Sequence, residues 1–580
     1  MQSIRLKILL PAFASLVLAV LLVHTTPALG QSTAPSDPFT GLQIERVDVV
    51  ITNPGPDAAL NGRIADGVRR SVAIFPGARY SADRTYFALA QARRVPDVAK
   101  IDHSVSFGER GGLIVTVSVT ITNAAEAGDA RGAIAKGTGF PVLYDNDGTF
   151  VRARLEGVAL VYTNDNSWFG RPDLMLAGNP LAVGTPAGRG FTGWLETYVN
   201  AGLSGITPVT DSLYVYGAAS VMATASAGRE LFTDERRNYL AIEDAYAGFI
   251  VGQTTTAGNR YGLNVSAGRQ RFQLANGFLI ANTAGNGGDR GALQANARWA
   301  ADMTAQAQLF WNDNKLEAFF VDPDELPVVD SQTQIAGVNL EVKPAPGLML
   351  GGSWLTVPRS TASYFSALGQ AGTREGLELW DVRFTWAPAV PGTSGPFFGG
   401  EFAQQTNRNF AMRARAGYGE AGWSFPQSPW SPSFSYRLSY FSGDDPTTSR
   451  FERWDPLLSG GNGEQWVQGV NMFKVVQDSN SVAHRFQARI RPGKKVELVS
   501  QFWVFRADSL SNIGGNPALQ VLSTKDYGQE VNLTAKWFAS RRVYVHGQIG
   551  YTMAGSAIRN ALDRDASDWF SAMTFVRYAF

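Results

Sequence analysis

The alternation of side chains at the end of the chain constrains the fold most. In residues 569–580 every second position shares one face of a strand, and that face carries Phe570, Val576, Tyr578 and Phe580. Aromatic and apolar side chains on one face of a closing strand suit the lipid and the aromatic girdle around a transmembrane β-barrel. We therefore expect an outer-membrane barrel that closes with these residues.

The composition agrees with spanning by strands. Downstream of residue 30 there is no apolar run of about 20 residues, which excludes a helical membrane protein. The 61 Gly, 18 Tyr and 14 Trp fit alternating strands, and the absence of Cys removes disulfides and thiol chemistry. A net charge of +1 gives no bulk preference for nucleic acid, and we expect no nucleic-acid partner.

Residues 1–30 have the pattern of an export signal. Arg5 and Lys7 precede the apolar stretch 8–23, and the small-residue sequence 28–30 offers a cleavage site after Gly30. The alternative is an uncleaved transmembrane anchor, but the apolar stretch is short of a bilayer span and no cluster of charges follows it. We expect removal of this segment.

A small domain is predicted next. Residues 31–42 are rich in turn-forming types and predict a flexible lead-in, whereas 43–122 predict elements in the order β-α-α-β-β. The strands are expected at 44–52, 99–107 and 113–121, with two helices between the first and second strands. Residues 123–148 are expected to link this domain to the barrel.

This order of elements resembles a POTRA domain, the periplasmic module that precedes barrels in protein-assembly and two-partner-secretion transporters. The resemblance rests on element order over about 80 residues. It implies a periplasmic location for the domain and contacts with export or synthesis machinery.

Residues 149–580 predict an all-β barrel of about eighteen antiparallel strands. Short periplasmic turns are expected at 205–208, 254–258, 300–302, 343–347, 388–395, 426–432, 491–494 and 539–541. Long extracellular loops are expected at 165–189, 224–237, 269–288, 313–332, 357–375, 443–481, 508–525 and 554–566, with 405–410 as a short exception. A soluble sandwich or propeller has no reason to separate long from short loops in this way.

Strand parity then separates a lipid face from a water face. In 527–538, for example, apolar side chains alternate with Glu530, Asn532, Thr534 and Lys536. Placing charge on the lipid face would cost about 2 to 4 kcal/mol at the midplane, so charged positions are assigned inward. The inward basic residues predicted in this way are Arg152, Arg154, Arg298, Arg383, Arg413, Arg415, Arg437, Arg485 and Arg489. The inward acidic residues are Glu156, Asp381, Glu401, Glu497 and Glu530. Gln294, Asn296 and Arg298 are assigned to a strand between the loop 269–288 and the turn 300–302.

Two interpretations of this arginine-rich lumen stay open, and both can hold. The arginines can pair with carboxylates across strands and fill a wet interior. Alternatively they form an electropositive conduit, in which guanidinium groups bind carboxylate or phosphate bidentately while acidic neighbours prevent trapping.

Two segments resemble signatures of the alginate-export porin family. These are the run 442–458, which contains Gly-Asp-Asp-Pro and Arg-Trp-Asp-Pro, and Ala267-Gly268-Arg269-Gln270 followed by Gly277-Phe278-Leu279. The resemblance covers the barrel and not the preceding domain. It implies a barrel of about eighteen strands, with an arginine-rich lumen through which an anionic polyuronate leaves the cell.

The run 442–458 lies in a long loop and adds a set of charged candidates: Asp444, Asp445, Arg450, Arg453 and Asp455. Turn chemistry explains Gly-Asp-Asp-Pro directly. A calcium site built on Asp444 and Asp445 is the alternative, but the ligand spacing is not diagnostic, and we expect no metal and no cofactor.

The leading functional hypothesis is an outer-membrane porin for export or diffusion of an anionic polysaccharide or oligosaccharide. The alternatives are a general small-solute porin and a protein translocator of the two-partner-secretion type. Translocators carry an Arg-Gly-Phe or Arg-Gly-Tyr tip in a late inward loop, whereas Arg189-Gly190-Phe191 lies between the first two strands. An enzyme is not expected, because His103, His484 and His546 are far apart and lack catalytic or metal-ligand spacing.

Overall fold

The computed structural model describes residues 39, 42–72, 74, 80–93, 95–108, 112–122, 141–146, 148–255, 259–460, 468–493, 495–540 and 542–579. The expected export signal, most of the lead-in, residues 123–140 of the expected link and Phe580 lie outside this set.

Within these residues, eighteen antiparallel strands form a closed barrel. They are β5 (Thr149–Asp165), β6 (Phe191–Pro208), β7 (Leu213–Gly228), β8 (Arg237–Thr254), β9 (Arg260–Arg269), β10 (Met303–Trp311), β11 (Asn314–Asp322), β12 (Gln334–Ala345), β13 (Leu348–Arg359), β16 (Leu377–Trp386), β17 (Gly395–Asn407), β18 (Ala414–Ser424), β19 (Ser433–Phe441), β20 (Ser481–Gly493), β21 (Val496–Arg506), β22 (Asp526–Phe538), β23 (Val543–Ala554) and β24 (Trp569–Ala579). The ring closes where β24 pairs with β5, from Phe570 opposite Asp165 to Ala579 opposite Glu156. Closure leaves no free sheet edge, as a bilayer requires. The predicted barrel is confirmed.

Two smaller strand pairings accompany the ring. β4 (Val142–Asn146) pairs with the first residues of β5, beyond the point where β24 ends. Part of the segment expected as a link therefore extends the wall. β14 (Ser363–Ser366) and β15 (Gly369–Thr373) form a separate hairpin in the loop between β13 and β16.

Connections of different length separate to the two ends of the barrel. At the end that we call the short-turn end, the connections are 209–212, 255–259, 312–313, 346–347, 387–394, 425–432, 494–495 and 539–542. At the opposite, long-loop end they are 166–190, 229–236, 270–302, 323–333, 360–376, 408–413, 442–480, 507–525 and 555–568. The long and short alternation expected from the sequence is present.

One predicted strand is wrong. Residues 288–300 form no strand but belong to the single connection 270–302, and 300–302 is not a turn of the short-turn end. A strand was missed instead at β11, which had been assigned to a loop, so the two errors cancel in the strand count. The reason is local: Gln294, Asn296 and Arg298 alternate with small or apolar residues, and this period of two imitates a strand.

The two faces of the wall separate as predicted on most strands. On β19, Phe434 is 52% exposed, whereas the intervening Arg437 is 4% exposed. On β22, Leu533 faces outward and Glu530 inward. At these positions polar side chains face the interior behind an apolar exterior, as in transmembrane barrels. No helix among the described residues is long and apolar enough to span a membrane.

The N-terminal domain has the predicted order of elements. It consists of β1 (Ile44–Ile51), α2 (Ala58–Ser71), α3 (Ala82–Ala92), β2 (Val98–Phe107) and β3 (Leu113–Ile121). The sheet order is β1-β3-β2, with β3 parallel to β1 and antiparallel to β2. The Asp57 side chain accepts hydrogen bonds from the amides of Ala59 and Leu60 and so starts α2.

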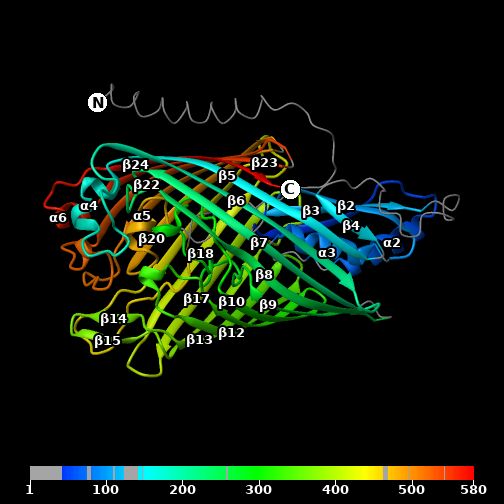
Figure 1. Cartoon of the computed structure of the whole chain (residues 1–580), viewed down its shortest axis with the longest axis horizontal. Coiled ribbons are helices and arrows are strands. Elements are labelled where there is room, and N and C mark those ends of the chain that lie inside the picture. The colour runs from blue at the N-terminus through cyan, green and yellow to red at the C-terminus, as the bar shows by residue number, and fades with distance from the viewer. Residues whose placement is uncertain are drawn as a thin grey trace.

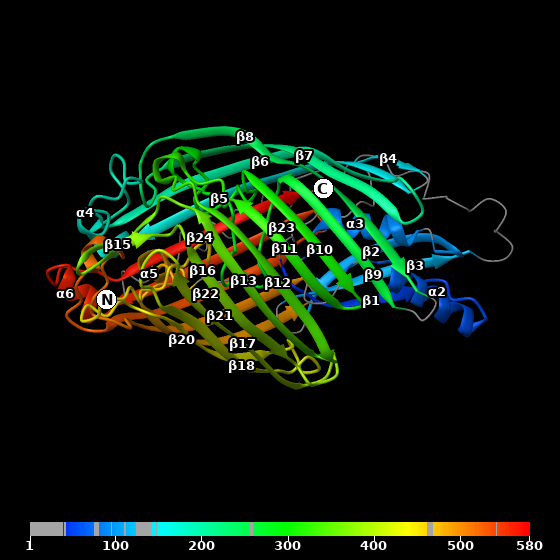
Figure 2. The same ribbon diagram turned by 90° about the horizontal axis from the view of Figure 1, so that it is seen from below.

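Helix α3 is buried on two sides, because the domain lies at the short-turn mouth of the barrel (Figures 1 and 2). Ala88 and Leu89 pack with the sheet of their own domain. Tyr86 and Phe87 pack instead against the barrel, in a cluster with Phe150, Ile206, Tyr214 and other residues. A helix that is apolar around most of its circumference is expected to be enclosed. α3 is thus one of the contacts between the domain and the interior wall.

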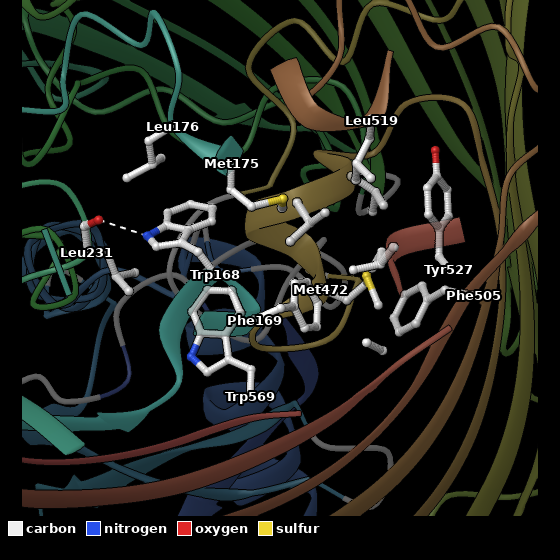
Figure 3. Packing of buried hydrophobic residues seen from close by; sticks show 14 of the residues in the cluster. Trp168, Phe169, Met175, Leu176, Leu231, Met472, Phe505, Leu519, Tyr527 and Trp569 are labelled. Atoms are coloured by element: carbon white, nitrogen blue, oxygen red, sulfur yellow. Dashed lines mark hydrogen bonds between the residues drawn. The ribbon is translucent and has the colours of Figure 1, made fainter. Parts of the chain in front are cut away.

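Apolar side chains fill the interior towards the long-loop end. Figure 3 shows part of one cluster, in which Trp168 and Phe169 from the connection 166–190 lie beside Trp569 of β24 and Met472 of α5 (Met472–Val476). The Trp168 indole donates a hydrogen bond to the Leu231 carbonyl at 2.8 Å. The short helices α4 (Pro172–Met175) and α6 (Ser556–Ala561) add to the same cluster. The loops of this end therefore fold inward and pack on the wall.

Candidate functional site

A β-bulge in β8 places two consecutive carboxylates in the lumen. The pairing of β7 with β8 shifts between Ala219 and Val221, where two β8 residues, Glu243 and Asp244, oppose one residue of β7. Both carboxylates are buried, whereas successive side chains of a regular strand point to opposite faces. The bulge therefore provides two acidic groups at one level of the wall.

The connection 270–302 joins β9 to β10 and crosses the lumen on the way. We call it the inner loop. At one side, Glu243 accepts the amide hydrogens of Trp299 and Ala300 at 2.8 and 3.0 Å. At the other side, the Asn276 side chain donates to Glu401 of β17 at 3.1 Å and to the Tyr418 hydroxyl of β18 at 2.8 Å. The inner loop is thus tied to opposite parts of the wall and narrows the interior.

Between α3 and the inner loop lies a cavity of about 890 Å³. We call it the vestibule. Arg154 and Glu156 of β5 line its wall, Arg271 and Trp299 of the inner loop line it from within the barrel, and Asp83 lines it from α3. Turn residues such as Asp211, Ser212 and Asn312 place it at the short-turn end.

Arg271 differs from Arg154 and Arg577, which also line the vestibule. Its guanidinium lies over the Trp299 ring, 4.3 Å from the ring centroid. No carboxylate of the described residues lies within ion-pair distance of it, whereas Arg577 pairs with Glu156 at 2.7 Å and Arg154 with Asp244 at 2.9 Å. A planar guanidinium held by an aromatic ring keeps its donors available for a carboxylate. Arg271 is therefore the group best placed to bind an anion.

Asp83 brings a carboxylate from the N-terminal domain to the barrel wall. It lies 3.4 Å from Nε of Arg154 and 3.8 Å from Nε of Arg152, and it accepts a hydrogen bond from the Ser204 hydroxyl at 3.0 Å. Burial alone would raise the pKa of Asp83, but Arg154, Arg152 and Ser204 hold that pKa below its ordinary value. Asp83 therefore stays ionised at this contact.

Most of the other predicted lumen arginines face inward and are paired. Arg383 pairs with Asp381 at 2.8 Å and with Glu341 at 3.3 Å. On neighbouring strands, Arg485 pairs with Glu420, and Arg437 is buried with its guanidinium 5.4 Å from the Trp503 ring centroid. Arg383 and Arg485 are therefore paired with carboxylates of the same or a nearby strand, as the first interpretation of the lumen expects.

Three basic side chains surround the Glu497 carboxylate at the short-turn end. Lys536 lies at 2.9 Å, Arg491 at 2.9 Å and Arg489 at 3.7 Å from its carboxylate. The predicted residues Glu497 and Arg489 are thus close in space, and Lys536 and Arg491 lie nearer to the same carboxylate.

Two predicted lumen residues hold loops in place. The Glu530 carboxylate accepts backbone amides of 470–472 and the Thr552 hydroxyl. Arg298, which lies on the inner loop and not on a strand, pairs with Glu243 at 2.6 Å and Asp324 at 2.8 Å. Each is almost fully buried, so it positions a loop and is not exposed to a solute.

The inward assignment of Arg413 and Arg415 is wrong. Both are exposed, and the inward positions of this segment are Ala414 and Ala416, which pack in an apolar cluster. Residues 413–417 alternate arginine or glycine with alanine, so neither face of this segment is distinctly apolar, and strand parity could not tell the lipid face from the lumen face. Arg415 lies near the long-loop end of β18, where a charged side chain can reach the polar part of a membrane.

Residues 216–571 match the Alginate export family. The chain belongs to this family. No curated protein matches the sequence.

Solved barrels of Pseudomonas aeruginosa are similar at low identity. OprD is 10% identical, with a TM-score of 0.43, over 74% of this chain and 93% of its own. OccK7 (OpdD) is 9% identical, with a TM-score of 0.43, and OpdL is 8% identical, with a TM-score of 0.44. Each of these two matches covers 74% of this chain and 98% of the other.

In segment 442–458 of this alginate-export family member, Asp444 and Asp445 accept hydrogen bonds from residues of the same segment. Asp444 accepts the Glu452 amide at 2.9 Å, and burial raises its pKa. Exposed Asp445 accepts the amide and hydroxyl of Thr447 at 2.9 and 2.7 Å, which is the turn chemistry expected for this segment. The described residues contain no group of three or more His, Cys, Asp or Glu side chains arranged to hold a metal ion.

Three further residues of this loop have structural partners. Asp455 accepts hydrogen bonds from Arg374 at 2.8 and 3.1 Å and from the Tyr364 hydroxyl at 2.6 Å. Burial alone would raise its pKa, but Arg374 and Tyr364 hold it below the ordinary value. Arg450 lies 3.9 Å from Glu452 at the surface, and Arg453 donates to the Gly514 carbonyl at 3.2 Å.

Sequence reasoning missed the residues that define the vestibule. Arg271 follows directly after the predicted family signature 267–270 but was assigned to a loop outside the barrel. Asp83 lies on a helix of the N-terminal domain, which the sequence did not place beside the barrel wall. Arg577 shares the inward parity of Trp569 and Ser571 on β24, so strand parity alone could have found it.

Proposed function

We propose that this outer-membrane channel conducts an anionic polysaccharide or oligosaccharide through its arginine-rich lumen. Arg271 in the vestibule is the observation that carries the proposal. A uronate carboxylate can accept two hydrogen bonds from its guanidinium, and the sugar ring can pack against the neighbouring aromatic side chains.

The acidic groups of the vestibule favour passage over trapping. Glu156, Glu243 and Asp244 lie around the same cavity and repel an anion that is bound too deeply. A conduit needs binding that is favourable enough for entry and weak enough for exit. Alternating charges along the wall meet this requirement better than a purely basic lining.

The proposed orientation places the short-turn end and the N-terminal domain in the periplasm. Barrels of bacterial outer membranes have short periplasmic turns and longer extracellular loops. The N-terminal domain, whose element order resembles a POTRA domain, lies at the short-turn end, where it could contact export or synthesis machinery. An anionic chain would then enter the vestibule first and pass the inner loop second.

Anion preference in planar bilayers tests the proposal. We expect the reversal potential of the intact protein in a salt gradient to show anion preference, and Arg271→Gln to reduce it. Binding of an alginate oligosaccharide, measured by calorimetry, should weaken roughly tenfold or more in the same variant. Arg415→Gln is the matched control, since this arginine faces outward and should leave both measurements unchanged. Cation preference in the intact protein would contradict the proposal.

The N-terminal domain is also the observation that favours a protein translocator. Against this alternative, Arg189 of the Arg-Gly-Phe sequence is exposed and pairs with Asp565 at 2.7 Å, in a loop at the long-loop end. A secreted partner that stays in the periplasm when this protein is deleted would support translocation. A general small-solute porin, in contrast, would bind neutral and anionic oligosaccharides alike.

A further inference from the structure

The contact between α3 and the barrel contains a binding site for a carboxylate. Asp83 lies in the first turn of α3, is 8% exposed, and enters a group made of Arg152 and Arg154 on β5 and Ser204 on β6. Two guanidinium groups and a hydroxyl provide several donors around one anionic group. The N-terminal domain thus presents to the wall the same chemical group that a uronic acid carries.

Asp83 does not accept hydrogen bonds from all the donors of this site. Nε of Arg152 is buried and has no hydrogen-bond partner among the described residues, since Asp83 lies 3.8 Å away. The Arg152 guanidinium instead lies 4.9 Å from the Tyr86 ring centroid. A buried donor without a partner costs free energy. A carboxylate that approached Arg152 closely enough to accept a hydrogen bond from Nε would therefore bind more tightly.

We propose that Asp83 is an internal competitor for this site: it holds α3 in the short-turn mouth until the carboxylate of an anionic saccharide takes its place on Arg152, Arg154 and Ser204. The inference rests on the proposed function, because the solute that the channel conducts is also the solute that opens the mouth. α3 also contacts the wall through Tyr86 and Phe87, which pack with apolar side chains, and the Tyr86 ring lies beside the Arg152 guanidinium. These ring contacts do not require the charge of Asp83, so α3 can dock again when the saccharide leaves.

The vestibule connects the two carboxylate sites. Asp83, Arg154 and Arg271 line one cavity, so a saccharide bound at Arg271 already lies in the space that reaches the α3 contact. A polyanion has several carboxylates, and a second one on the same chain acts at a high effective concentration. A polymer is therefore a better competitor for Asp83 than a single small anion.

The absence of Cys from the chain allows a direct test of α3 release in the full-length protein. Ala90 is 1% exposed and lies on the barrel side of α3, so Ala90→Cys introduces one thiol that a maleimide reaches only when α3 leaves the wall. We expect an alginate oligosaccharide to accelerate labelling roughly tenfold or more, whereas a neutral maltose oligosaccharide of the same length should have no effect. Adding Asp83→Asn should make labelling fast without saccharide and insensitive to it.

Control variants separate charge from folding. Asp66→Asn removes an exposed carboxylate of α2 that pairs with Arg69, and it should label as slowly as the parent. Asp83→Glu keeps the charge and should restore slow labelling, and the heat-dependent gel migration of each variant reports that the barrel is folded.

The outcomes distinguish this inference from the proposed function. If calorimetry shows that the alginate oligosaccharide binds while labelling is unchanged, and Asp83→Asn also labels slowly, competition by Asp83 is overturned and the proposed function stands. If the oligosaccharide binds neither the parent nor Asp83→Asn, the proposed function fails and the assigned competitor fails with it. Both are supported if the oligosaccharide binds and accelerates labelling of the parent, while Asp83→Asn labels fast with or without the oligosaccharide.

Discussion

At the scale of single residues, the partner of each arginine decides what that arginine can do. Arg383 lies between Asp381 and Glu341, and its charge is already compensated. Arg271 lies over Trp299, and no carboxylate of the described residues lies within ion-pair distance of it, so an incoming anion displaces no ion pair there. An arginine-rich lumen is therefore not a uniform binding surface, and a few positions are expected to determine affinity for a solute.

The pH dependence of the α3 contact follows from Asp83. Its neighbours are Arg84 on the same helix, Arg152 and Arg154 on β5, Ser204 on β6, and Asp244 and Tyr246 on β8. Because the docked pKa of Asp83 lies below its ordinary value, the carboxylate stabilises docking above the undocked pKa of about 3.9. This contribution is lost as the pH falls through the docked pKa.

Conductance between pH 6 and pH 3 should therefore rise below about pH 4 in the intact protein. In Asp83→Asn the conductance should already be high at pH 6 and should lack this step. A step of the same size in both proteins would assign the titration to another group.

At the scale of elements, one device fixes the loops that enter the barrel. A glutamate on the wall accepts successive backbone amides of a loop: Glu196 accepts those of Gln294 and Ala295, and Glu243 accepts those of Trp299 and Ala300. Glu530 does the same for 470–472. A buried carboxylate that receives several amide donors is well stabilised, and it also satisfies loop amides that are shielded from water.

Glu530→Gln should loosen the segment 468–480 without opening the strand pairs of β22. A neutral amide replaces a charged acceptor of several backbone hydrogens, and we expect a loss of about 1.5 to 3 kcal/mol from the packing of this loop. Amide hydrogen exchange at 470–472 should speed up in Glu530→Gln. The control is Glu235→Gln, which changes an exposed glutamate in the connection 229–236. Unchanged exchange at 470–472 would show that the apolar cluster alone holds the loop.

The same anchor explains the glycine at 469. Gly469 has a φ of +79°, and a Cβ at this position would lie 2.6 Å from Oε1 of Glu530. Glycine is thus required both by its backbone conformation and by the close approach of the loop to the carboxylate.

At the scale of the whole molecule, three layers occupy the barrel interior. The N-terminal domain covers the short-turn mouth, the inner loop crosses the lumen, and apolar clusters pack towards the long-loop end (Figures 2 and 3). The domain also contacts the opposite side of the mouth, where Phe107 lies 4.6 Å from Phe538, measured between ring centroids. Contacts on both sides of the opening make the domain a cover for the mouth.

Deletion of residues 39–122 should increase the mean current through the barrel, because it removes this cover while leaving β5 and all later strands. Barrel closure depends on β24 and β5, which lie outside the deleted segment. The measurement is bilayer conductance, with heat-dependent gel migration as the check that the barrel has folded. A folded variant with unchanged conductance would place the main barrier at the inner loop or at the long-loop end.

The sequence by itself determined the wall of this protein. Alternation along strands such as β19 and β22 follows from one requirement, lipid outside and water inside. The separation of long from short connections is the ordinary pattern of outer-membrane barrels. Local patterns also predicted the elements of the N-terminal domain, because its helices and strands have distinct periods. The predictions failed where the pattern lacked contrast, as on β18, or where a loop imitated a strand, as at 288–300.

The tertiary structure alone decided what lies inside the wall. Whether a loop points out or folds back depends on contacts between residues far apart in sequence, such as Asn276 with Glu401, and no local period records them. The bulge at Glu243 and Asp244 and the position of Asp83 beside Arg154 are of the same kind. Parity fixes the side of a sheet on which a charge lies, whereas its partner, and therefore its availability to a solute, is set only when the chain closes on itself.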